Sequence, residues 1–191
     1  MPAGKQENLC APRVLPMIVP VAHHLVQLFS MVPSCFRCLC QLRSPNPAGE
    51  LQMDERVHDL DVRGNLMVAA CMNRQIVVYN VAGPAPVVHN KKESPLKYQT
   101  RCVRCFPDQT GFAVGSIEGR VGIQYVQKPP GKDHFAFKCH RNGSDVYSVN
   151  DMAFQNTFGT FATVGSDGVV TFWDKDNKQR LKAFGAISQT I

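Results

Sequence analysis

The sequence lacks an uninterrupted run of about 20 apolar residues, the length that a membrane-spanning helix needs. Its most apolar stretch, residues 13–40, is interrupted by Pro16, Pro20 and Pro33 and by a pair of adjacent histidines. The beginning of the chain also lacks the ordered basic, apolar and small-residue regions of a secretory signal. We therefore expect no membrane span, no cleaved leader and no membrane partner.

Cysteine is scarce, with eight in 191 residues, which excludes a small domain held together mainly by disulfides. Cys35, Cys38 and Cys40 lie close together, and Cys102 and Cys105 form a second group. Thiolates from two such groups can bind zinc. However, the groups are far apart in the sequence, and residues three apart on a strand point to opposite faces. We expect reduced, structural thiols and neither a metal nor another cofactor.

Acidic residues are the minority, since 21 Lys and Arg against 15 Asp and Glu give a net charge of +6. The remaining composition, 44% hydrophobic, excludes collagen, coiled coils and wholly disordered chains. The length fits one domain, or one domain with an appendage. Residues 91–145 hold 10 basic and 5 acidic side chains. This local excess suggests an acidic partner, either a peptide or a phosphate backbone; a solvated surface without a partner is the alternative.

Three segments of the chain repeat one pattern: a β-rich run, a tight turn and a second β-rich run. Aligning Tyr79, Gln124 and Trp173 gives spacings of 45 and 49 residues. This period is typical of the four-stranded blades of WD-repeat β-propellers, so the sequence predicts an all-β fold with about three blades. The repeating segments are 67–80, 112–125 and 161–174.

Each blade also needs a strand before its hairpin and another after it. We expect the leading strands at residues 57–62, 101–106 and 146–154. The outer strands should be more polar because they lie at sheet edges, and the candidates are residues 86–88, 135–137 and 181–184. The blades are then expected near residues 51–90, 95–138 and 140–185.

The third repeat has the fullest signature, with a glycine turn at residues 166–168 and Trp173-Asp174 at the end of the next strand. These residues resemble the WD-repeat family. The resemblance implies that His140, Asp167 and Trp173 form a buried hydrogen-bond network with a structural role. The alternative is catalysis by Ser166, His140 and Asp167. Because the sequence has no nucleophile elbow, glycine-rich phosphate loop or metal-binding helix motif, we predict a binding module and not an enzyme.

Longer motifs narrow the resemblance to the WD-repeat mRNA export factors of the nuclear pore. The spindle-checkpoint WD-repeat proteins are close relatives, but Trp-Asp-Lys-Asp at residues 173–176 favours the export group. The resemblance covers residues 42–191. The motifs that support it lie at residues 94–102, 115–121, 137–141, 165–168 and 172–176.

The resemblance implies a closed, seven-bladed propeller, whereas this sequence shows about three blades. We expect an incomplete WD40 ring over residues 42–191, and an irregular segment foreign to the propeller over residues 1–41. We interpret the chain as the product of a truncated gene model or a splice variant. An open ring should leave two apolar blade faces exposed. The isolated chain should then be marginally stable, prone to aggregate or dependent on a partner.

The resemblance also implies a partner, an acidic and partly helical nucleoporin segment whose glutamates meet arginines on one face of the propeller. Arg101 and Arg120 match those arginines, and Arg141 is a third candidate. Arginine suits this role because its planar guanidinium can bind a carboxylate through two hydrogen bonds. The alternative is that Arg120 pairs with Glu118 or remains in solvent.

A second basic surface is expected after Trp173. It consists of Lys175, Lys178, Arg180 and Lys182. The resemblance implies that RNA-bearing or viral partners bind there. No aromatic residue is interleaved with its basic residues for base stacking.

The leading prediction is a non-enzymatic scaffold in mRNA export, located in the nucleus, at the nuclear pore and in the cytoplasm. The alternatives are a spindle-checkpoint scaffold with mitotic partners and a direct RNA-binding protein.

Overall fold

The computed structural model describes residues 18–21, 24–27, 36–40, 47–83 and 85–185. These residues form β-strands and their connections, together with a short 3₁₀ helix, η1 (Met72–Arg74). No helix in this described part of the chain is long and apolar enough to cross a membrane. The expected all-β fold is confirmed.

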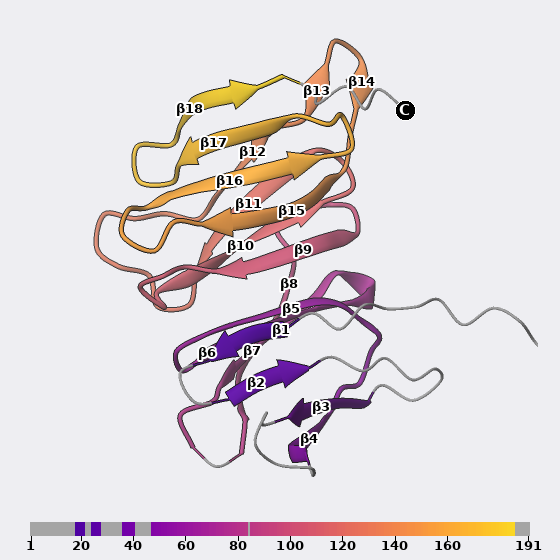
Figure 1. The fold of residues 1–191 in the computed structure, drawn as a ribbon, viewed down its shortest axis with the longest axis vertical. Helices are drawn as coiled ribbons and strands as arrows, with labels where there is room; N and C mark the ends of the chain where they lie inside the picture. Colours follow the sequence, from indigo (N-terminus) through magenta and orange to yellow (C-terminus); the bar gives the residue numbers. More distant parts are fainter. Residues whose placement is uncertain (1–17, 22–23, 28–35, 41–46, 84, 186–191) are drawn as a thin grey trace, which may run out of the picture.

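Three antiparallel sheets, each made of four consecutive strands, form most of the molecule (Figure 1). The first sheet contains β5 (Val57–Arg63), β6 (Leu66–Cys71), β7 (Gln75–Asn80) and β8 (Val87–Glu93). The second contains β9 (Thr100–Cys105), β10 (Gly111–Ser116), β11 (Arg120–Tyr125) and β12 (Phe135–Lys138). The third contains β15 (Val149–Phe154), β16 (Thr160–Gly165), β17 (Val170–Asp174) and β18 (Gln179–Phe184). Each sheet is a propeller blade.

The strand register confirms the repeat alignment that the sequence suggested. Met67 pairs with Tyr79 in the first sheet, and Phe112 pairs with Gln124 in the second. Phe161 pairs with Trp173 at the same place in the third sheet. The three aligned residues therefore occupy equivalent positions, and each sheet can be compared with the others residue by residue.

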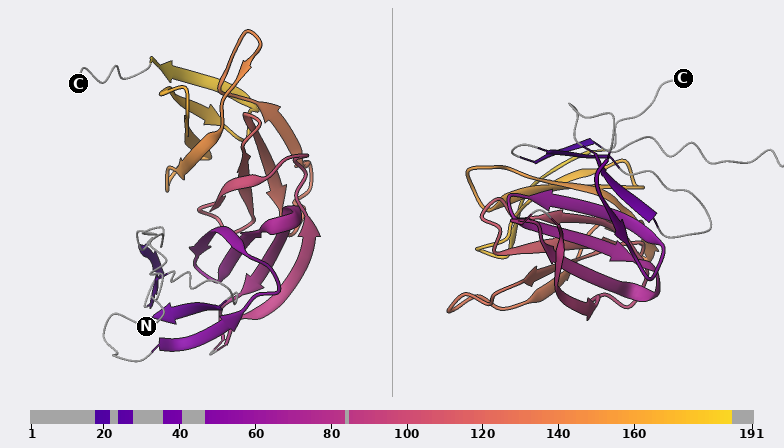
Figure 2. Two further views of the ribbon diagram at one scale, coloured as in Figure 1. Left: turned by 90° about the vertical axis from the view of Figure 1, so that its right-hand side faces the viewer. Right: turned by 90° about the horizontal axis from the view of Figure 1, so that it is seen from below.

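The sheets are arranged as part of a ring. Their innermost strands, β5, β9 and β15, lie side by side, and β9 contacts both of the others. The sheets follow one another along an open arc, with the outer strands β8, β12 and β18 away from this centre (Figure 2). The chain thus forms an incomplete propeller.

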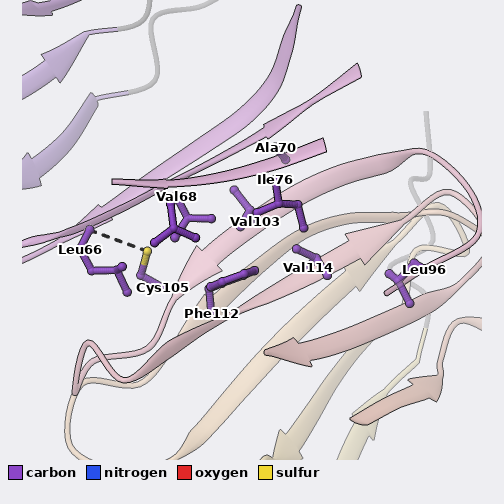
Figure 3. Close-up of a cluster of buried hydrophobic side chains, with 10 residues drawn as sticks. Leu66, Val68, Ala70, Ile76, Leu96, Val103, Cys105, Phe112 and Val114 are labelled. Carbon is purple, nitrogen blue, oxygen red and sulfur yellow. Dashed lines mark hydrogen bonds between the residues drawn. The ribbon is translucent and has the colours of Figure 1, made fainter. Parts of the chain in front are cut away.

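Apolar side chains fill the space between neighbouring sheets. Strand β6 is buried along its whole length, as expected for a strand covered on both faces. Figure 3 shows the cluster between the first and second sheets: Leu66, Val68, Ala70, Ile76, Val78, Leu96, Val103, Cys105, Phe112 and Val114. The cluster between the second and third sheets includes Phe106, Ile123, Tyr125, Met152 and Phe161. Burying one such large side chain stabilises the fold by about 1.5–3 kcal/mol.

The leading strand of the third sheet begins later than predicted. Residues 146–154 were expected to form one strand, but β15 starts at Val149. The preceding residues form a separate hairpin of β13 (Arg141–Asn142) and β14 (Asp145–Val146). This hairpin is closed by the Tyr147 amide, which donates to the carbonyl oxygen of His140 at 3.0 Å. The peptide groups before Val149 are thus already paired locally.

The segment expected to be irregular contains short strands. β1 (Ile18–Val21) pairs with β2 (His24–Gln27), and β3 (Phe36–Cys40) pairs with β4 (Pro47–Gln52). Three of the four residues of β1 are β-branched, which favours an extended strand despite Pro20. β1 contacts β5 of the first sheet.

This contact bears on the expectation that two apolar blade faces would be exposed. On the outer face of the first sheet, Leu60, Met67, Ala69 and Val77 are buried. On the third sheet, in contrast, Val164, Phe172 and Phe184 are 39%, 38% and 48% exposed. The expectation was therefore wrong for the first sheet and is confirmed for the third.

Candidate functional site

A chain of hydrogen bonds links the predicted structural residues of the third sheet. His140 Nδ1 lies 2.9 and 3.0 Å from the two carboxylate oxygens of Asp167. Its Nε2 lies 2.8 Å from Thr163 Oγ1, to which Trp173 Nε1 donates at 3.0 Å. His140, Asp167 and Trp173 thus form the predicted network, with Thr163 as a fourth member that the sequence analysis missed.

The chemistry of these groups orients the protons. A carboxylate only accepts hydrogen bonds and an indole N–H only donates, so His140 Nδ1 carries a proton toward Asp167. In the neutral imidazole Nε2 then accepts from the Thr163 hydroxyl, which in turn accepts from Trp173. Ser166 bonds elsewhere, to Ser148 Oγ at 2.6 Å and Asn150 Oδ1 at 3.2 Å. Because both ring nitrogens of His140 are used by the network, the geometry favours its structural role.

Local backbone features allow this network to form. His140 adopts a φ of +48°, and Gly165 lies directly against its ring. A Cβ atom at Gly165 would lie 2.3 Å from His140 Nδ1 and 2.7 Å from Asp167 Oδ1. The ring of Trp173 also packs 4.6 Å from the ring of Phe137 in the second sheet. The network therefore joins the turn and strands of the third sheet and positions Trp173 against its neighbour.

A basic groove lies between the second sheet and the β13–β14 hairpin. It has a volume of about 610 Å³, and four cationic side chains and one acidic side chain line it. The exposed side chains of Tyr98 and Val146 add apolar surface to this groove. The lining residues are Pro95, Leu96, Lys97, Tyr98, Glu118, Arg120, Lys138, Arg141 and Val146.

Both arginines of this basic groove contact Glu118. Its carboxylate oxygen Oε2 lies 3.6 Å from Arg120 Nε, while Arg141 Nη2 donates to the Glu118 carbonyl at 2.8 Å. The pairing of Arg120 with Glu118 is incomplete, because Glu118 Oε1 and Arg120 Nε are buried and make no hydrogen bond. The groove therefore has a surplus of positive charge, since four cationic side chains and one acidic side chain line it, and such a surplus favours binding of a carboxylate.

The structure brings Arg120 and Arg141 together and leaves Arg101 outside the basic groove. Arg101 is exposed on β9 and is not among the lining residues. The sequence could not separate these arginines, because β10 lies between β9 and β11 in the sheet, and this order decides which arginine lies near the hairpin.

One residue of the second predicted basic surface is buried, and the other three are exposed. Lys175 is 4% exposed, with Nζ lying 5.1 Å from the centre of the Phe106 ring and 3.0 Å from Asp176. The expectation that Lys175 is an exposed partner-binding residue is therefore corrected. Arg180 and Lys182 are exposed on β18, and Lys178 is exposed in the turn before it.

Aromatic rings do lie beside these basic residues, although the sequence does not interleave them. Lys178 Nζ lies 5.1 Å from the centre of the Phe135 ring on the neighbouring sheet. Both residues line an aromatic cavity of about 230 Å³ between β12 and β17 to β18. The aromatic cavity is lined by Phe135, Phe137, Lys138, Phe161, Trp173, Asp174, Lys175, Lys178 and Gln179.

The innermost strands carry a buried charge cluster. Arg104 donates to Asp59 of β5 at 2.7 Å and also to Asp151 of β15. Asp59 further accepts from the Val103 amide at 2.8 Å, and Asp61 accepts from the Cys105 amide at 2.7 Å. Burial raises the pKa of both aspartates, and hydrogen bonds and Arg104 counter this only in part. The cluster ties the three sheets together at the centre of the arc.

The two described cysteines of β9 point away from each other. Cys102 packs toward the third sheet and Cys105 toward the first, so they point to opposite faces of β9 as predicted. Burial raises the pKa of both thiols, which disfavours thiolates. The side chains of Cys35, Cys38 and Cys40 lie outside the described residues. Within the described part, no three His, Cys, Asp or Glu residues cluster as metal ligands.

Comparison with known proteins identifies relatives, although no protein-family model matches the chain. It is 49% identical over 149 residues to the protein RAE1 of Arabidopsis thaliana, an alignment that covers 78% of this chain and 42% of that protein. It is 47% identical over 154 residues to the mRNA export factor GLE2 of Chaetomium thermophilum, covering 78% and 43%. The WD40 repeat protein poxJ of Penicillium oxalicum is 42% identical over 156 residues, covering 78% and 45%.

The chain thus spans less than half the length of these relatives. Its repeated four-stranded sheets and the network between His140 and Trp173 agree with the name that the third relative bears. On this evidence, the chain belongs to the WD40-repeat family of the RAE1 and GLE2 mRNA export factors.

Proposed function

We propose that this chain is a non-enzymatic WD40 scaffold in nuclear mRNA export that docks an acidic nucleoporin segment in the basic groove. The names of its relatives supply the process, since they include an mRNA export factor. The proposal places the protein in the nucleus, at the nuclear pore and in the cytoplasm, because an export factor must move between these compartments.

The observation that carries the docking proposal is the convergence of Arg120 and Arg141 on one partly paired glutamate. Lys97 and Lys138 line the same basic groove, so four cations face a single acidic side chain, Glu118. A glutamate of the incoming segment can accept hydrogen bonds from the guanidinium groups, while Tyr98 offers an apolar contact. Partial burial strengthens such charge-assisted bonds relative to those in water.

The experiment is a calorimetric titration of the chain with a glutamate-rich nucleoporin peptide. Saturable one-to-one binding that weakens moderately with salt supports the proposal, because screening reduces attraction between partly exposed charges. A peptide of the same length with each glutamate replaced by glutamine serves as the control. Equal affinity for both peptides contradicts docking through the arginines.

A second candidate function is RNA binding at the aromatic cavity and its basic rim. The favouring observation is that Phe135 and Trp173 line this cavity beside Lys178 and Lys138, since single-stranded RNA binds through stacking on aromatic rings and backbone charge. The test is a fluorescence titration with a labelled single-stranded RNA. Binding that falls steeply with salt and is reduced by Lys178→Ala supports this function. A spindle-checkpoint scaffold with mitotic partners is the remaining alternative, and the same nucleoporin peptide titration addresses its docking surface.

A further inference from the structure

The cations of the basic groove come from three separate parts of the chain. Lys97 belongs to the loop between β8 and β9, and Arg141 belongs to the hairpin strand β13. Arg120 and Lys138 lie on β11 and β12 of the second sheet. All four line one groove of about 610 Å³, together with the exposed side chain of Tyr98. An anion in this groove can therefore be bound by all three parts at once.

Two of these cations lie directly opposite each other. Arg120 pairs with Lys138 across β11 and β12, and the Cβ atoms of such a pair are about 4.5–5.5 Å apart. Equal charges at this position destabilise a sheet. In the repeat alignment, the equivalent pair of the first sheet is Gln75 and Glu93, which has no such repulsion. Departures from local rules of this kind are expected at functional sites, so the pair favours a bound anion.

The acidic side chain of the groove neutralises little of this charge. Glu118 is the one acidic residue among the described residues that line it. Its carboxylate lies 3.6 Å from Arg120, whereas Arg141 donates to its main-chain carbonyl oxygen and not to its carboxylate. Four cations against one carboxylate leave three positive charges. A docked glutamate brings one negative charge and leaves two of them.

A phosphate monoester matches this surplus better than a carboxylate does. At pH 7 a phosphoserine carries about 1.5–2 negative charges and offers three strong acceptor oxygens, whereas a glutamate carries one charge and two oxygens. Arginine binds phosphate through two parallel hydrogen bonds, and clusters of arginines recognise phosphorylated motifs. The exposed phenol of Tyr98 can donate a further hydrogen bond.

We propose that the basic groove binds a phosphoserine of the acidic docking segment in preference to a glutamate, with Arg120, Lys138 and Arg141 around the phosphate group. This preference rests on the docking proposed above, and it adds that phosphorylation of the partner strengthens that docking. The partner, and not this chain, then carries the regulatory modification.

The experiment titrates the full chain calorimetrically with three peptides of the nucleoporin type that differ at one position. That position is glutamate, phosphoserine or serine in an otherwise identical glutamate-rich sequence. We expect the phosphoserine peptide to bind roughly tenfold tighter than the glutamate peptide, because it accepts at least one more charge-assisted hydrogen bond. The serine peptide should bind most weakly. A phosphoserine peptide that binds no tighter than the glutamate peptide overturns the preference.

Lys138→Gln tests where the phosphate group lies. This exposed cation should contribute more to the phosphate than to a carboxylate, so its loss should reduce the preference by about two- to fivefold, as for a partly exposed ion pair. Arg101→Gln is the matched control, because it removes an exposed cation outside the groove and should leave the preference unchanged. Lys97→Gln repeats the test should Lys138→Gln fold poorly, as judged by its melting temperature. A wild-type preference in both groove variants contradicts the site.

The outcomes separate this preference from the docking itself. Equal binding of the glutamate and phosphoserine peptides supports docking and overturns the preference. Binding of the phosphoserine peptide alone supports the phosphate site and contradicts docking of an unmodified acidic segment. If no peptide binds, docking fails, and acetyl-phosphoserine amide is then titrated and followed by phosphorus NMR. A shift of its resonance that Arg120→Ala abolishes supports the phosphate site, and the absence of a shift overturns it.

Discussion

Arg104, on the innermost strand of the second sheet, donates a 2.7 Å hydrogen bond to Asp59 on the innermost strand of the first. Both side chains are buried, with 14% and 9% exposed, and Arg104 also reaches Asp151 of the third sheet. A single arginine therefore connects all three sheets through charged side chains at the centre of the arc.

Replacing Arg104 by alanine should lower the free energy of unfolding by about 3–5 kcal/mol, because it leaves the buried carboxylate of Asp59 without its cation. The measurement is urea denaturation followed by tryptophan fluorescence. Arg101→Ala is the matched control on the same strand, and it should change stability by no more than about 0.5 kcal/mol. Similar losses of stability in both variants would show that the ion pair of Arg104 with Asp59 does not account for the effect.

The two buried aspartates predict a dependence of stability on pH. Burial raises the pKa of Asp59 and of Asp61 above the usual 3.8, so the folded state binds these protons more tightly than the unfolded chain. Their contribution to stability is complete below about pH 3.8 and is lost as the pH rises through the raised values. Relative to Asp61→Asn, the wild type should therefore lose stability as the pH rises from about 3.8 toward 7. Urea midpoints across this range check the sign, and parallel curves for the two proteins would contradict it.

The repeat pattern was visible in the sequence because the same strand position recurs. Tyr79, Gln124 and Trp173 are separated by nearly constant spacings, and each pairs with the first residue of its repeat. A turn residue such as Gly168, with φ of +72°, also marks where a hairpin closes. Local rules of strand alternation and turn chemistry therefore predict the central hairpin of each sheet, but they did not predict that β15 begins only at Val149.

The candidate sites depended on distances that a sequence does not contain. Thr163 looks like an ordinary β-branched strand residue until His140 and Trp173 converge on its hydroxyl. Lys175 lies among charged residues, yet its amine is placed over the ring of Phe106 from another sheet. Packing between sheets decided both cases, so neither followed from local pattern.

The close approach of Gly165 to His140 predicts a severe effect of one methyl group. Gly165→Ala should destabilise the chain by about 1–3 kcal/mol or more, because its Cβ would overlap the imidazole and both must shift. Gly185→Ala is the control, since a Cβ there meets nothing within 4 Å. Thermal melts of the two variants test this, and a Gly165→Ala protein as stable as wild type would contradict the geometry.

The network through Thr163 should behave cooperatively. Thr163→Val leaves His140 Nε2 and the Trp173 N–H without a partner, and we expect a loss of about 1–3 kcal/mol. Trp173→Phe removes only the indole N–H that donates to Thr163. The hydrogen bonds lost in this variant should therefore lower the free energy of unfolding by less than those lost in Thr163→Val. A double-mutant cycle should give a coupling energy of about 0.5 kcal/mol or more. Additive effects would mean that the hydroxyl does not link the two rings.

The most direct test of the account compares peptide binding by the wild type, Arg120→Ala and Arg101→Ala. All three are titrated calorimetrically with the glutamate-rich nucleoporin peptide. Arg120 lines the basic groove and Arg101 does not, so Arg120→Ala should lose about 2–5 kcal/mol of binding free energy if it holds a desolvated glutamate. Arg101→Ala should bind like the wild type. Unchanged affinity in Arg120→Ala, or no binding by the soluble wild-type chain, would contradict docking in the basic groove.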